Sequence, residues 1–200
     1  MGIIVVVDEK LNWKSNTDNI CKKIASGLGA LRRLKEFVDQ KTLLSIYNAI
    51  IQPYFDYCCE VWNVFGETQS TRLQKLHNRA ARIITSMPNE VDQDTVLHEL
   101  KWEPLKTQRE KAKAKIMYKI LNHMGPECLQ NLFTFREEVL NHNLRNSAFN
   151  VCLPKPRTNS MKKSLMFDGG SIWNSLPLDI RNSQSLKLFK RKIAAYSETH

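Results

Sequence analysis

The sequence lacks the short patterns on which most predictions of an enzyme rest. It contains no phosphate-binding glycine loop, no G-x-G-x-x-G and no G-x-S-x-G. Its five cysteines show no C-x-x-C spacing and its five histidines form no H-x-x-x-H pair, which argues against a disulfide framework and a zinc site. No run of about 18 apolar residues occurs, and the start lacks the features of a signal peptide. These absences predict an intracellular protein, nuclear or cytoplasmic, without a membrane span.

Acidic residues are scarce in the second half of the chain. Residues 1–100 hold 12 basic and 12 acidic residues, whereas residues 101–200 hold 18 and 8. An excess of this kind favours a polyanionic partner, because clustered positive charge attracts phosphates. Nucleic acid is favoured over membrane, since no long basic amphipathic helix with exposed aromatics is present. The alternative is that the excess charge only keeps the protein soluble.

Helical periodicity is clearest between residues 72 and 87. The apolar residues of this stretch, among them Leu73, Ala80 and Ile84, fall within an arc of about 100° on a helix and are expected to face the core. A separate arc of about 80° holds the basic row Arg72, Lys75, Arg79 and Arg82. This row is interpreted either as a set of phosphate contacts or as a solvated face.

Other stretches also favour helices. Apolar spacing predicts helices from about residue 17 to 38, after an N-cap at Asp39, from 105 to 124, and after an N-cap at Ser185. In the third of these, Arg109 lies on the apolar side, and the remaining surface carries Lys106, Lys111, Lys113 and Lys115. The β-branched run Ile3–Val7 indicates a short buried strand. The predicted fold is therefore mainly α, with a short N-terminal strand and a less regular C-terminal region that ends in a helix.

Carboxylates suited to two-metal catalysis are poorly grouped. Asp92 and Asp94 lie close together but in a polar loop, and Asp8 follows the apolar run alone. A solvated loop is the favoured interpretation of the first pair. An autonomous Mg²⁺-dependent nuclease that uses these three aspartates is the least favoured hypothesis.

Five segments in one order carry a resemblance to a known family. They are residues 3–13, 43–62, 73–85, 100–121 and 173–193. Together they resemble the C-terminal part of the reverse transcriptase of LINE-type, jockey-like non-LTR retrotransposons. His77 departs from the glutamine that is usual in that family. The resemblance assigns structural roles to Tyr47, Pro53, Tyr57, Trp62, Arg109, Trp173, Asn174, Pro177 and Phe189.

The resemblance implies a domain organisation and a function. Residues 1–13 would leave a missing palm domain, residues 14–124 would form a helical thumb-like domain, and residues 125–200 a basic post-thumb region. The family's catalytic Ala-Asp-Asp turn and its Mg²⁺ belong to that palm, and this chain contains no Asp-Asp dipeptide. The chain is therefore expected to be non-catalytic, to need no cofactor of its own, and to accompany the catalytic half of the polymerase.

The expected partner is an RNA/DNA template-primer, held through phosphates by the basic helical faces. The expected contacts are Arg72, Lys75, Arg79 and Arg82, followed by Lys106, Lys111, Lys113 and Lys115. The alternative hypothesis is a helical protein-interaction module that does not bind nucleic acid.

Overall fold

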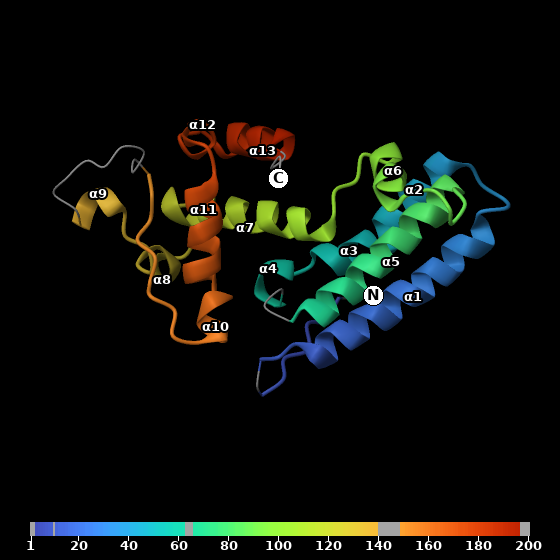
Figure 1. Ribbon diagram of the computed structural model, residues 1–200, viewed down its shortest axis with the longest axis horizontal. Coiled ribbons are helices and arrows are strands. Elements are labelled where there is room, and N and C mark those ends of the chain that lie inside the picture. Colours follow the sequence, from blue (N-terminus) through green and yellow to red (C-terminus); the bar gives the residue numbers. More distant parts are fainter. Residues whose placement is uncertain (1–2, 10, 63–65, 140–148, 197–200) are drawn as a thin grey trace. The chain divides into compact units, whose positions relative to one another are not determined.

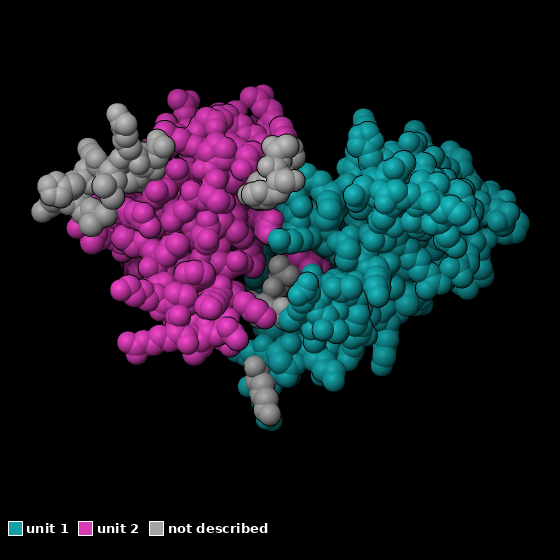
Figure 2. All heavy atoms as spheres, in the orientation of Figure 1, with its two compact units in different colours: residues 1–108 teal, residues 109–200 magenta. Residues whose placement is uncertain are grey.

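The computed structural model describes residues 3–9, 11–62, 66–139 and 149–196, and the fold is mainly α, as the sequence predicted (Figure 1). The chain divides into two compact units, residues 1–108 and 109–200 (Figure 2). The first unit contains α1 (Lys14–Leu34), α2 (Gln40–Ile50), α3 (Gln52–Asp56), α4 (Cys59–Trp62), α5 (Glu67–Thr85) and α6 (Gln93–Glu99). Helix α7 (Leu105–Leu121) begins in the first unit and continues into the second. The second unit also contains α8 (Glu127–Gln130), α9 (Arg136–Val139), α10 (Asn159–Lys162), the π-helix η1 (Leu165–Gly169), α11 (Gly170–Ser175), α12 (Leu178–Arg181) and α13 (Leu186–Ala195).

The predicted strand at Ile3–Val7 is wrong, because this segment forms no sheet. Pairing within the described ranges is confined to one isolated antiparallel bridge in the second unit. The Asp8 carboxylate instead accepts the backbone N–H groups of Asn12 and Trp13, at 3.0 and 2.7 Å. A β-branched run needs a neighbouring strand for its backbone hydrogen bonds, and here it is followed by a turn at Asp8 and then by α1.

Helix α1 packs against α5 and α2 in the first unit, and α6 packs against α5. Sequence and structure agree on how α2 begins, since the Asp39 carboxylate accepts the Thr42 N–H at 3.0 Å. Hydrogen bonds from the Thr42 side chain and from the Thr42 N–H hold the pKa of Asp39 below its ordinary value. Pro53 lies in the first turn of the short α3, where its missing N–H leaves no helical hydrogen bond unmade.

An aromatic cluster fills the centre of this unit. His77 is 1% exposed and lies 4.8 Å from Trp102 and 5.6 Å from Phe55, measured between ring centroids. Tyr47 is fully buried, packs on Trp102 and donates its hydroxyl proton to Gln52 at 2.8 Å. Burial raises the pKa of Tyr47 above its ordinary value. These side chains therefore hold α2, α3 and α5 together.

Trp62 and Tyr57, to which the resemblance assigns structural roles, differ in burial. Trp62 is fully buried and donates its indole N–H to the carbonyl of Tyr57 at 2.7 Å. The Tyr57 side chain itself is 47% exposed. The backbone of Tyr57, and not its ring, therefore helps to anchor α4.

The core of the second unit is built around α7 and three stacked rings. The Tyr118 and Phe189 rings lie 4.5 Å apart between centroids, and Trp173 lies 6.0 Å from Phe189. Ala114 and Met117 of α7 complete this cluster with residues of α11 and α13. Because the tail packs on α7, the division between units falls at residues 108 and 109 and not near residue 125.

The paired residues Trp173 and Asn174 hold an extended segment in place. The Trp173 indole donates to the carbonyl of Phe149 at 2.8 Å. The Asn174 amide accepts the Val151 N–H at 2.9 Å and donates to the Val151 carbonyl at 3.0 Å. The N–H of Phe149 is bound by Glu137 at 2.9 Å. Satisfying buried backbone groups in this way gives Trp173 and Asn174 a structural role.

The last two helices start as their sequences suggest. Pro177 precedes α12 as its N-cap residue, and the Ser185 hydroxyl accepts the Leu188 N–H at 3.2 Å to cap α13. Phe189 and Ile193 of α13 are buried, as the periodicity of the last helix predicted.

Candidate nucleic-acid interface

Helix α5 presents a core face and an outer face. Its buried residues are Leu73, His77, Ala80, Ala81, Ile83 and Ile84. The predicted basic row lies on the other side of the helix, as an amphipathic pattern requires. The four residues of the row nevertheless have different surroundings.

Arg72 and Arg82, at the two ends of the row, are used within the fold. Arg72 donates to the Asp18 carboxylate of α1 at 2.6 Å, a bond that raises the pKa of the Arg72 guanidinium. Arg82 donates to the carbonyls of Pro88 and Val91, both at 2.8 Å. Arg82 thereby fastens the loop between α5 and α6, so its guanidinium is directed to that loop instead of to a phosphate.

Lys75 and Arg79 occupy the middle of the row and are both exposed. Within the part of the chain that the structure describes, neither side chain makes a hydrogen bond or an ion pair. Residues four positions apart lie on one side of a helix, with their Cβ atoms about 6 Å apart. The two cations are therefore available together to an anion.

Helix α1 extends this positive surface. Helices α1 and α5 lie side by side and run in the same direction, and the Asp18–Arg72 bond joins their first halves (Figure 1). Lys22, one turn after Asp18, is exposed. We define Lys22, Lys75 and Arg79 as the α1–α5 surface.

Acidic residues on these two helices are confined to their N-terminal ends, where Asp18 of α1 is bound to Arg72 and Glu67 begins α5. Residues 19–34 and 68–85 contain four cations each and no aspartate or glutamate. The first hundred residues are neutral in total, so the charge of these two helices is balanced elsewhere in the unit. Lys22 was not among the contacts predicted from the sequence, although this segregation of charge along α1 and α5 is visible there.

Two of the predicted phosphate contacts on α7, Lys111 and Lys113, are buried. Lys111 is 8% exposed and its ammonium donates to the carbonyl of Ala194 at 3.1 Å, near the C-terminus of α13, where a cation is stabilised by the helix dipole. Lys113 is 5% exposed and pairs with the Asp168 carboxylate of η1. Both lysines belong to the interior of the second unit, because different parts of the tail cover the two sides of α7 on which they lie.

The other charged residues of α7 differ in exposure. Lys106 is exposed and Lys115 is half-buried. Arg109 is 3% exposed, in agreement with its position on the apolar side of the helix. Of the four proposed contacts on α7, Lys106 and Lys115 are therefore the two whose side chains reach solvent.

Two of the three aspartates considered for metal chemistry bind backbone N–H groups. Asp92 precedes α6 and accepts the Asp94 N–H at 3.0 Å, and Asp8 binds the backbone before α1. Among the described residues, no three His, Cys, Asp or Glu side chains gather as a possible metal site. The same part of the chain contains no helix that is both long and apolar enough to cross a membrane.

Comparisons with protein-family models, with curated proteins and with solved structures find no match to this chain. The fold and the exposed cations are therefore the observations on which a function can be built.

Proposed function

We propose that this chain is a non-catalytic C-terminal part of a LINE-type reverse transcriptase and that it binds template-primer nucleic acid through the α1–α5 surface. The order of the five sequence segments supports the family. The single observation that supports binding is the exposed, uncompensated pair Lys75 and Arg79 on a helix whose other face is anchored in the core. The catalytic palm and its Mg²⁺ would lie outside this chain.

The proposed mechanism is positional. Lysine and arginine contacts to phosphates supply affinity without sequence preference and fix the orientation of a duplex. The Asp18–Arg72 pair ties α1 to α5, so the cations are carried by a helix pair and not by a loop. A rigid grip of this kind would keep the primer end in register for chemistry performed elsewhere.

The test is the salt dependence of binding to an RNA/DNA hybrid, followed by fluorescence anisotropy. We expect the double variant Lys75→Gln and Arg79→Gln to bind more weakly and to flatten the slope of log K against log salt by up to about 2, because each lost phosphate contact removes about 0.9. The matched control is Lys35→Gln with Lys41→Gln, which removes the same charge from the same unit. Equal slopes for the two double variants would refute the assignment of the α1–α5 surface.

A second candidate, the protein-interaction module, is favoured by exposed apolar side chains near the N-terminus. Ile4, Val7 and Leu11 are 72%, 64% and 57% exposed. Under this hypothesis the chain associates with a protein in a salt-insensitive way. Absence of hybrid binding at about 50 mM salt, in a sample shown to be folded by circular dichroism, would favour this candidate.

A further inference from the structure

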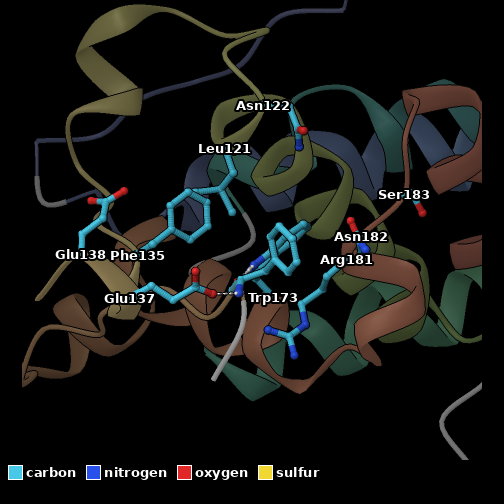
Figure 3. A pocket seen from close by; sticks show the side chains of 10 residues that line it. Leu121, Asn122, Phe135, Glu137, Glu138, Trp173, Arg181, Asn182 and Ser183 are labelled. Atoms are coloured by element: carbon cyan, nitrogen blue, oxygen red, sulfur yellow. Dashed lines mark hydrogen bonds between the residues drawn. The ribbon is translucent and has the colours of Figure 1, made fainter. Parts of the chain in front are cut away.

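The second unit contains a cavity of about 280 Å³, and Figure 3 shows the side chains around it. Its lining comes from the end of α7, from α9 and the residue before it, from Phe149, from Trp173 of α11, and from the segment that ends α12. Ligand pockets usually measure about 300 to 1,000 Å³, so this cavity suits one small ring system and excludes a duplex.

Phe149 is held in an unusual conformation at the edge of this cavity. Its φ angle is 61°, in the left-handed region that bulky side chains rarely adopt. Hydrogen bonds from both sides maintain this conformation, since Glu137 binds its N–H and the Trp173 indole binds its carbonyl. Although the backbone is fixed twice, the Phe149 side chain remains 40% exposed. Strained residues that the surroundings maintain are often found at binding sites, and here the result is an aromatic ring that lines a cavity.

The cavity wall carries the carboxylates of Glu137 and Glu138 and the buried guanidinium of Arg181, in a unit that is otherwise strongly basic. Residues 109–200 hold 16 basic and 7 acidic residues. Two of these acids, Asp168 and Asp179, are paired with lysines. Glu137 and Glu138 instead line the cavity on the side where Phe135 lies (Figure 3). Glu138 is exposed, and its carboxylate makes no hydrogen bond or ion pair with any residue that the structure describes.

These groups together define the chemistry of a ligand. A flat ring can stack on an aromatic side chain, and a carboxylate accepts hydrogen bonds from N–H donors on the edge of that ring. A basic surround attracts an anionic strand that carries such rings. A positively charged ligand would also suit Glu138, but the 16 cations of the unit oppose its approach.

We propose that the cavity binds one unpaired base of a single strand. The base stacks on Phe149, and its amino group donates a hydrogen bond to the Glu138 carboxylate. Cytosine, which has such an amino group, is therefore preferred over uracil, which has none. The inference rests on the proposed nucleic-acid binding and adds a base preference to it. The α1–α5 surface lies in the other unit, so phosphate contacts and base contacts can be removed separately.

Two measurements test the inference. The first is the anisotropy of labelled oligocytidine and oligouridine strands of about 12 nucleotides, within the usual range of single-strand site sizes. The second is the NMR shift of the Trp173 indole N–H on addition of cytidine or uridine monophosphate, a reporter that adjoins Phe149 and does not depend on the α1–α5 surface. The variants are Phe149→Leu, which keeps bulk without an aromatic face, Phe149→Tyr, which restores the face, and Glu138→Gln.

The expected result is tighter binding of oligocytidine by the unaltered chain. Phe149→Leu should weaken binding of oligocytidine by about tenfold, Phe149→Tyr should recover it, and Glu138→Gln should equalise the two strands. Equal affinity for the two strands, together with an indole N–H that neither nucleotide shifts, would overturn the inference. If cytidine monophosphate shifts the indole N–H while strand binding is indifferent to Lys75 and Arg79, the cavity is supported and the α1–α5 assignment fails.

Discussion

Replacing Asp168 by alanine should destabilise the second unit much more than replacing its partner Lys113 by methionine. The Lys113 side chain is 6% exposed and that of Asp168 is 38% exposed. Removing one partner of a fully buried ion pair costs about 3 to 5 kcal/mol, because the other charge stays buried without compensation. Asp168 is partly screened by water, so we expect about 2 to 3 kcal/mol for Asp168→Ala. Lys113→Met leaves the carboxylate able to reach water and fills the interior with an apolar chain, so we expect a change within about 1 kcal/mol.

Urea unfolding of the two variants and of the double variant measures this asymmetry as a shift of the midpoint at constant m. The double variant should resemble Lys113→Met, because no buried ammonium remains. Nucleic-acid affinity of Lys113→Met should equal that of the unaltered chain, since this ammonium faces the interior. Equal losses of stability for the two single variants, or a loss of affinity in Lys113→Met, would refute the structural role assigned to Lys113.

Three further predictions follow from local geometry. Gly29→Ala should stabilise α1 by up to about 1 kcal/mol, because only the tip of one arginine side chain lies within 4 Å of the new Cβ. Gly27→Ala should not stabilise the protein, because its Cβ would lie 2.7 Å from a buried isoleucine side chain. Urea midpoints compare the two. Asn174→Ala should cost about 2 to 4 kcal/mol by leaving two backbone groups of a buried valine unpaired, and an unchanged midpoint would contradict this. Cys21 should react with iodoacetamide more slowly than the exposed Cys128 at pH 8, because burial raises the pKa of the Cys21 thiol and lowers its thiolate fraction; peptide mass spectrometry measures the order.

The sequence predicted α5 and its two faces because helical periodicity is a local property. It did not predict which cations of the basic row are bound within the fold and which are exposed. Arg72 and Arg82 are bound by Asp18 and by the carbonyls of Pro88 and Val91, and each of these contacts depends on how other segments return to α5. Spacing along one helix places side chains on a face but does not show what arrives opposite them.

On helix α7, too, spacing along the helix did not show which lysines would be covered by other segments. Lys111 and Lys113 are two positions apart and lie about 200° from each other around the helix, so no single solvent face can be read from them. The tail, more than 50 residues later, supplies both the Asp168 carboxylate and the Ala194 carbonyl. The cavity beside Phe149 was also missed, because it is assembled from five segments without a shared periodicity.

By itself the sequence determined the mainly helical character, the caps at Asp39 and Ser185, and the separation of charge along the chain, all of which depend on neighbouring residues. Tertiary structure decided whether Ile3–Val7 became a strand and which lysines reach solvent. It also decided which aromatic rings became core. These outcomes depend on contacts between distant segments, and such contacts form only where the complete chain places complementary groups together.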